Sequence, residues 1–184
     1  MNYQTNKKGG WIIPSGSTIE AVTDIPAYSE LGDGCELGYS CELGYGCHLG
    51  DDCHLGNSCK LGHRCTLGNS CTLGDYCRLG YSCELGDHCE LGHHCTLGHS
   101  CELGNDCTWL GVTVARHMQV QNVDGSGRTI NLVWGTCGTV KVEAGCFLGT
   151  VDEFCAKAEK EGKMRYVRLV RFLAHEEEQN SEAQ

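Results

Sequence analysis

The chain has 184 residues, including 26 glycines, 16 cysteines and only 2 prolines, and carries a formal charge of −10. This acidity argues against direct binding to nucleic-acid phosphates, and no segment approaches the roughly 20 apolar residues that a membrane span requires. Residues 30–108 hold 12 Asp/Glu and 3 Lys/Arg, whereas residues 109–184 hold 10 and 9. The acidity therefore belongs to one part of the chain.

The first residues carry no recognisable secretory signal. Lys7 and Lys8 are followed by an apolar stretch of only three residues, 11–13, which is too short for the apolar core of a signal peptide. We therefore expect a cytoplasmic protein whose thiols are reduced.

A six-residue repeat dominates the sequence. Its unit is C-x-L-G-x-x, with a Cys at every sixth position from Cys35 to Cys107 and a Leu two residues after each Cys up to Cys101. The same register continues upstream, with Ser17, Thr23 and Ser29 in the Cys position and Ile13, Ile19, Ile25 and Leu31 in the Leu position. The Cys position therefore requires a small residue rather than a thiol.

This spacing predicts very short strands. Residues two apart on an extended strand point the same way, so Cys and Leu face one interior while the residue between them faces out. Such strands are stable only when successive coils stack at roughly 4.8 Å. Because Pro14, Glu20 and Pro26 occupy the Gly position in the earliest units, that position does not require a positive φ.

The pattern L-G-x-x-small-x, from residue 13 to about 108, resembles that of hexapeptide-repeat proteins. The resemblance implies a left-handed parallel β-helix with 18 residues per triangular coil, so the sixteen aliphatic anchors would make about five coils. We thus expect a mainly β fold with a lead-in at 1–12, a β-helix at 13–111 and a C-terminal module at 112–184.

The C-terminal module is predicted to combine a β-hairpin with helices. Trp109 occupies the next aliphatic position, but Leu110-Gly111 follows one residue late and breaks the register. Residues 117–123 and 128–134 alternate around 124–127 as in a hairpin, and 139–143 predicts a further strand. A capping box at 150–153 opens a helix to about Glu161, and a second helix runs from about Lys163 to Glu178.

The second helix has two distinctive faces. Its apolar face would cover either the open end of the solenoid or a partner subunit in a dimer or trimer, and its basic face is a candidate anion site. The apolar residues are Tyr166, Val167, Val170 and Leu173, and the basic ones are Arg165, Arg168 and Arg171. Residues 144–154 also resemble the C-terminal modules of phage and prophage repeat proteins.

The cysteines are predicted to be buried free thiols. A metal store would need converging thiolates, typically in C-x₂₋₄-C pairs, which the sequence lacks. Side chains in a parallel column lie about 4.8 Å apart, too far for regular disulfides. Disulfide-braced insect antifreeze coils also repeat Cys at this interval, but the Leu in every unit argues against that alternative. We predict no metal and no cofactor.

The outward positions form three ladders, one on each corner of the coil. They are Tyr39, Asn57, Asp75 and His93; Tyr45, His63, Tyr81 and His99; and Asp51, Asn69, Asp87 and Asn105. The candidate partner-binding surface comprises Tyr45, His63, Tyr81, His99, Asp51, Asp87, Glu84 and Glu102. The alternative is that these ladders are surface stacking and turn chemistry without a partner.

Hexapeptide-repeat proteins include acyltransferases, which use a histidine near a loop that interrupts the coil, and zinc carbonic anhydrases, which gather three histidines between subunits. Here the repeat is uninterrupted, and His63 and His99 would stand two coils, roughly 10 Å, apart. His88, His93 and His94 could gather near one corner. We predict no catalytic residue and no enzymatic activity.

The favoured hypothesis is an acidic binding protein that docks a basic macromolecule, such as a phage-encoded inhibitor of a host nucleic-acid enzyme or defence system. A phage origin would place it in the bacterial host cell. Two alternatives remain: a CoA-dependent acyltransferase, and an oligomeric sponge for a nucleotide or another small anion.

Overall fold

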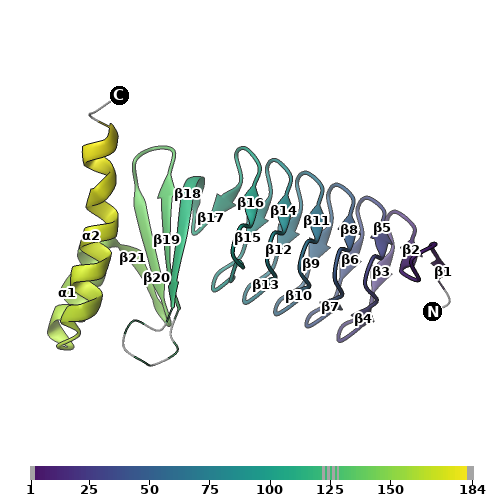
Figure 1. Cartoon of the computed structure of the whole chain (residues 1–184), viewed down its shortest axis with the longest axis horizontal. Helices are drawn as coiled ribbons and strands as arrows, with labels where there is room; N and C mark the ends of the chain where they lie inside the picture. Colours follow the sequence, from purple (N-terminus) through teal and green to yellow (C-terminus); the bar gives the residue numbers. More distant parts are fainter. Residues whose placement is uncertain (1–2, 122, 124, 126, 128, 182–184) are drawn as a thin grey trace. The chain divides into compact units, whose positions relative to one another are not determined.

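The computed structural model describes residues 3–121, 123, 125, 127 and 129–181, with side chains described as far as residue 174. The chain divides into two compact units, residues 1–111 and 112–184. Unit 1 is a parallel β-solenoid of about five coils, and unit 2 is an antiparallel sheet covered by two helices (Figure 1). The predicted mainly β, hexapeptide-type solenoid with C-terminal helices is confirmed.

The solenoid has three faces, each made of strands that pair in parallel with the strand 18 residues away. Face A contains β2 (Trp11–Ile13), β5 (Glu30–Leu31), β8 (His48–Leu49), β11 (Thr66–Leu67), β14 (Glu84–Leu85) and β16 (Glu102–Leu103), with β1 (Gln4–Thr5) antiparallel to β2. Face B contains β3 (Thr18–Ile19), β6 (Glu36–Leu37), β9 (His54–Leu55), β12 (Thr72–Leu73), β15 (Glu90–Leu91) and β17 (Thr108–Trp109). Face C contains β4 (Asp24–Ile25), β7 (Glu42–Leu43), β10 (Lys60–Leu61) and β13 (Arg78–Leu79), which bridges to Thr96.

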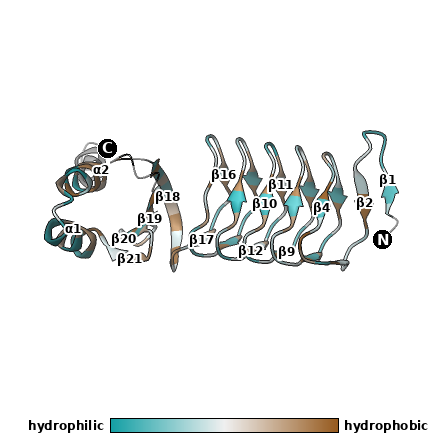
Figure 2. Cartoon of the chain, turned by 90° about the horizontal axis from the view of Figure 1, so that it is seen from below, coloured by the Kyte–Doolittle hydropathy of each residue, from teal (hydrophilic) through white to brown (hydrophobic). Residues whose placement is uncertain are grey.

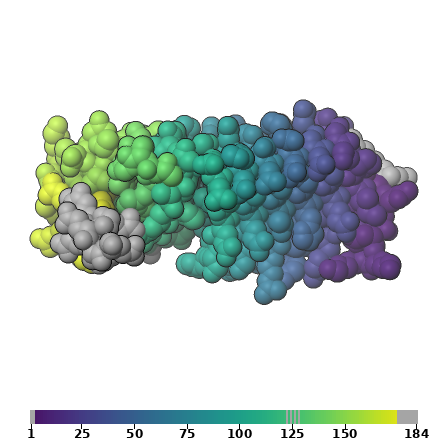
Figure 3. Space-filling model, turned by 90° about the horizontal axis from the view of Figure 1, so that it is seen from above, coloured from purple at the N-terminus to yellow at the C-terminus, as the bar shows by residue number. Residues whose placement is uncertain are grey.

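The chain passes from A to B to C, so we name its turns the AB, BC and CA corners. Coils follow one another in sequence order along the unit (Figure 3), because each coil pairs only with the coils before and after it. Sixteen aliphatic anchors from Ile13 to Leu103 line the interior, and all but half-buried Leu103 are buried. Trp109 continues the series, is buried and stands in register with Leu91.

The thiols line the interior beside the aliphatic anchors. Each repeat Sγ donates a weak hydrogen bond of 3.1–3.4 Å to the corner carbonyl 21 residues earlier, as Cys53 does to Gly32. Twelve of the thirteen repeat thiols are buried and Cys101 is half-buried; all are free. Burial raises the pKa of the Cys35, Cys41 and Cys107 thiols. Hydroxyls replace thiols only in the first coil, where Ser17 and its equivalents donate to a carbonyl of their own coil.

The corner glycines are required for close approach between coils and not for their backbone angle. A Cβ on Gly56 would lie 2.7 Å from the carbonyl carbon of Gly38 and 2.8 Å from the amide nitrogen of Tyr39. The positive φ falls instead on the last residue of each unit, such as Ser40 at 55°. Pro14, Glu20 and Pro26 are tolerated because they belong to the first coil, against whose backbone the later glycines Gly32, Gly38 and Gly44 pack.

Unit 2 begins with a four-stranded antiparallel sheet, which extends the predicted hairpin and third strand. Its order is β18 (Val112–Gln121), β19 (Thr129–Gly135), β20 (Val140–Ala144) and β21 (Phe147–Thr150). The hairpin register pairs Met118 with Leu132, and the predicted residues 122, 124, 126 and 128 lie outside the described part of the chain. Strand β21 was not predicted.

Both predicted helices are present. α1 (Val151–Lys160) opens with the expected capping box, in which Thr150 Oγ1 accepts from the Glu153 amide and the Glu153 carboxylate accepts from the Thr150 amide. α2 (Met164–Ser181) follows Gly162, whose φ is +71°. Each helix mixes hydrophobic and hydrophilic residues (Figure 2), and their buried residues join one core with the sheet. None of the helices among the described residues has the length and apolarity to cross a membrane.

Candidate functional site

The outward charges of the solenoid are segregated by face. Ten of the twelve Asp/Glu between residues 30 and 108 stand on faces A and B and on the AB corner between them, and we call this set the acidic edge. It comprises Glu30, Asp33, Glu36, Asp51, Asp52, Glu84, Asp87, Glu90, Glu102 and Asp106. Within the part of unit 1 that the structure describes, no Lys or Arg occupies faces A and B or their shared corner. The edge therefore carries charges of one sign in two groups, which the neutral residues Thr66, Asn69 and Thr72 of one coil separate.

Part of the acidic edge also holds the coils together. Asp51 Oδ1 accepts the backbone N–H of Asn69 at 2.6 Å, and Asp87 Oδ1 accepts that of Asn105 at 2.6 Å. Asn69 Oδ1 does the same for Asp87, so amides and carboxylates perform this task equally. These side chains satisfy N–H groups that the sheet ladders leave unpaired. The negative charge itself is not needed for the fold.

The CA corner carries a stack of aromatic rings. His63 and Tyr81 lie with ring centroids 4.6 Å apart and planes 3° from parallel, and Tyr81 and His99 are 5.7 Å apart at 15°. His63 Nδ1 accepts the Tyr81 backbone N–H at 2.8 Å, so the ring is held as the Nε2–H tautomer in this arrangement. Tyr45 does not join the stack, because its ring meets Tyr28 edge-on at 5.5 Å.

The basic residues of unit 1 gather around this same corner. Lys60 and Arg78 stand side by side on face C, and Arg64 directly follows His63. Lys7 and Lys8 line a pocket of about 240 Å³ with Tyr28 and with Glu30 of the acidic edge, and the Lys8 Nζ lies 4.9 Å from the Tyr28 ring centroid. These are all five Lys/Arg of residues 1–111.

The structure brings the predicted partner-binding residues onto face A and its two borders. Glu84 and Glu102 are register neighbours on face A, Asp51 and Asp87 lie on the AB corner, and the Tyr45 column forms the CA corner. The prediction overlooked the basic cluster beside the rings. Reading the sequence at intervals of 18 residues would have found this cluster, because Glu42, Lys60 and Arg78 then follow one another in a single column.

The structure places the apolar residues of the predicted assembly face against the sheet of their own unit. Tyr166 and Val170 are buried, and with Leu173 they pack against Ile130, Leu132 and the other apolar residues of the sheet in their own unit. The apolar face is therefore covered within the chain, and the dimer or trimer stays a prediction. Arg165 and Arg168 are exposed, and exposed Arg171 pairs with Glu159 at 3.1 Å.

The predicted gathering of His88, His93 and His94 at one corner is wrong. His88 follows Asp87 on the AB corner, whereas His93 and His94 lie on the BC corner. Within the described residues, no group of three His, Cys, Asp or Glu has the geometry to hold a metal ion. His94 instead stacks on Tyr76, with ring centroids 4.7 Å apart.

Unit 2 contains a smaller pocket of about 150 Å³. Phe147, Phe154 and Tyr166 form its apolar wall, and Lys157 and Lys163 border it. The Lys157 Nζ lies 5.5 Å from the Phe147 ring centroid, and Lys163 pairs with Glu161 at 2.5 Å. The predicted basic residues of α2 do not line this pocket.

Comparison with known proteins gives one match. Residues 46–81 match the family described as bacterial transferase hexapeptide (six repeats). The matched segment contains His63 and Tyr81 of the aromatic stack. No curated protein matches the chain, and no solved structure does. The prediction that the chain has no enzymatic activity is contradicted by this match, because the family is one of transferases.

Proposed function

We propose that the protein docks a basic macromolecular partner along its acidic edge. The observation that carries this proposal is the segregation of charge: ten carboxylates and no cation on two faces and their shared corner. A random scatter of the same residues would mix both signs on every face, as face C does with Glu42 and Lys60.

The spacing of the charges supports a partner with its own row of cations. Glu84 and Glu102 stand directly beside each other in register, an arrangement that costs stability because like charges on adjacent strands repel. A partner Lys or Arg between them would relieve that repulsion. A surface rich in negative charge resembles the phosphate backbone that the basic groove of a nucleic-acid enzyme binds. The proposed partner is therefore such an enzyme or a defence protein, and the proposed source of this protein is a phage.

The test uses substitutions already present in the same columns. Asp51→Asn keeps the acceptor that Asn69 provides, and Glu84→Thr and Glu90→Thr copy Thr66 and Thr72. A control variant also loses three carboxylates, but off the acidic edge. Its substitutions are Asp24→Thr, Glu42→Thr and Asp75→Asn.

Each protein is used for capture from a bacterial lysate, and captured proteins are identified, purified and titrated against it. We expect the acidic-edge variant to bind a captured partner at least about tenfold more weakly than the control variant does, with duplex DNA and added salt displacing the partner. Equal binding by the two variants, or a partner that duplex DNA does not displace, would refute docking through this edge.

Acyl transfer from CoA is a second candidate, favoured by the transferase family that matches residues 46–81. It predicts that acetyl-CoA raises the melting temperature by several degrees and that a small acceptor from the lysate is acetylated. The column-matched variants His48→Thr and His63→Asn test for the general base of the reaction, since only the variant that lacks this base should lose turnover. Absence of both acetyl-CoA stabilisation and product excludes this candidate.

A further inference from the structure

The CA corner is opposite in character to the acidic edge. All five cations of unit 1 surround it, although the unit as a whole is strongly acidic. Lys60 and Arg78 are register neighbours, so two positive charges repel across one strand pair. Lys60 has the exposed Glu42 as a partner, whereas Arg64 and Arg78 form no ion pair with any residue that the structure describes. Both exposed guanidinium groups are therefore available to bind an anion.

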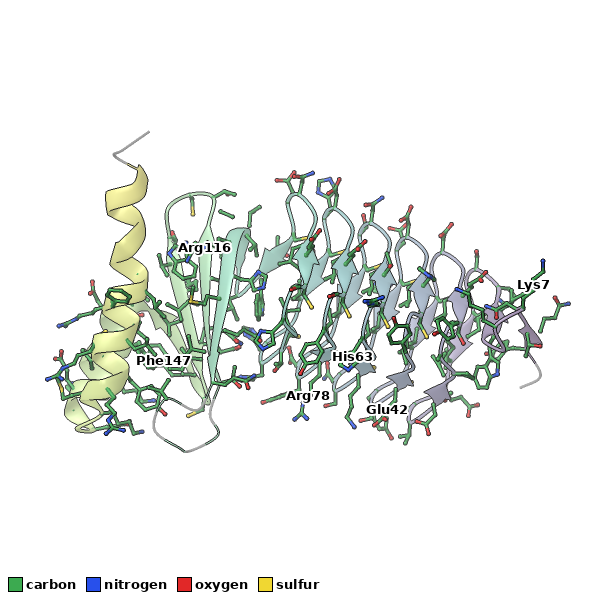
Figure 4. The ribbon with its side chains drawn as sticks, in the orientation of Figure 1. Lys7, Glu42, His63, Arg78, Arg116 and Phe147 are labelled. Atoms are coloured by element: carbon green, nitrogen blue, oxygen red, sulfur yellow. The ribbon has the colours of Figure 1, made fainter. Side chains whose placement is uncertain are left out.

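The rings beside these cations offer a flat surface. Tyr81 covers one face of the exposed His63 ring. Tyr45, which precedes His63 by one coil in the same column, is turned toward Tyr28. The stack therefore ends at His63, and the other face of this ring makes no ring contact with a described residue. Lys60 stands three residues before His63, as Arg78 does before Tyr81, so each ring follows a face C cation in the sequence. Figure 4 shows His63 and Arg78 on the solenoid.

We propose that this corner binds a nucleotide, with the base stacked on His63 and the phosphates held by Arg64, Arg78 and Lys60. Aromatic side chains accept any base through its π-face, and the guanidinium group forms paired hydrogen bonds with phosphate oxygens. A small ligand is favoured over a long nucleic acid, because a longer polyanion would meet the acidic faces of the same unit.

The substitutions again come from the columns themselves. His63→Asn removes the ring but keeps an acceptor for the Tyr81 N–H, as Asn57 does for Asp75. Arg64→Ser copies Ser82, and Arg78→Thr copies Thr96. His54→Thr, on face B, is the control, since Thr72 follows His54 in that column.

The experiment titrates the full-length protein with ATP and, separately, with tripolyphosphate, which has the charge without the base. We expect ATP to bind at least about fivefold more tightly than tripolyphosphate, and His63→Asn to remove that difference, because one stacked base is worth that much or more. Arg64→Ser and Arg78→Thr should each weaken both ligands about tenfold, while His54→Thr should change neither.

Three outcomes would overturn the proposal: no binding of ATP by the unaltered protein at millimolar concentration, equal affinity for both ligands, or no effect of the arginine substitutions. Melting curves of the variants show whether a loss reflects unfolding. The variant Asp51→Asn/Glu84→Thr/Glu90→Thr should retain ATP binding, so this site and the proposed docking edge fail or succeed independently.

Discussion

At the scale of single residues, each six-residue repeat has two positions with special backbone requirements. The Gly position needs the absence of a Cβ because the next coil packs against it, and the last position needs a positive φ. The sequence suggested the first point through Pro14, Glu20 and Pro26, which rule out a required positive φ at the Gly position. It could not reveal the second, because Ser, Asp, His and Arg all occupy the positive-φ position.

This difference between the two positions predicts unequal losses of stability for two glycine substitutions. Gly56→Ala should lower the free energy of unfolding by about 1–3 kcal/mol or more, since its Cβ would meet the Gly38 and Tyr39 backbone at 2.7–2.8 Å and neither can move away without separating the coils. Gly34→Asp should cost less, because Gly34 has open space around it and Asp52 occupies the same column with φ of 56°, so only the strain of an Asp at positive φ remains. Denaturant unfolding of both variants measures the difference, and similar losses would contradict this account.

At the scale of elements, the sequence predicted what local patterns determine. The period of six fixed the two-residue strands, and the capping box at 150–153 fixed the start of α1. It did not reveal β21, a strand of four residues that begins right after a tight turn at positive-φ Gly145. Nor could the apolar face of α2 indicate which surface it covers, because any apolar surface would bury Tyr166 and Val170. The separation of carboxylates and cations onto different faces of the solenoid likewise became evident only when residues 18 apart were compared.

Strand β18 supplies a pH prediction. His117 lies in register with Val133, on the sheet face opposite the helices, and burial lowers its pKa below the ordinary value of 6.5. His117 therefore takes up a proton near pH 6.5 in the unfolded chain, but only at a lower pH in the folded chain. The stability associated with neutral His117 is complete above that pH and is lost as the pH falls through the folded-state pKa.

We expect the free energy of unfolding to decrease as the pH is lowered from about 7.5 to about 5. In the His117→Gln variant, the free energy of unfolding should decrease less over the same range. Every other residue is the same in both proteins, so the difference between the two pH profiles isolates His117. Parallel profiles would show that this residue does not contribute.

At the scale of the whole molecule, the residues that make the composition unusual build the interior of unit 1. Any recognition of other molecules by this unit must therefore use its exterior. Cysteine satisfies two requirements at once: it fills a small apolar site, and its S–H donates to a corner carbonyl that the strand ladders do not use. The exterior then varies without cost to the fold, as the exchange of Asp, Asn and His at the inter-coil acceptor position shows. This freedom allows one unit to carry an acidic edge and a basic aromatic corner.

The buried interior makes a prediction for the thirteen repeat thiols and the two exposed thiols of unit 2. Alkylation requires an exposed thiolate, and twelve of the thirteen repeat thiols are buried. Burial raises the pKa at Cys35 and Cys41. The hydrogen bond with Cys71 lowers the pKa of Cys53 to about 7, so enclosure alone protects that thiol. Cys137 and Cys146 are exposed, and Thr139 lowers the pKa of Cys137 by hydrogen bonding. Mass spectrometry after brief iodoacetamide treatment of the native protein should find these two cysteines modified first, Cys101 more slowly, and the other repeat thiols only after denaturation. Because unfolding exposes every thiol, the denatured sample is the control; rapid modification of Cys53 or Cys71 in the native protein would mean that the solenoid interior is open to solvent.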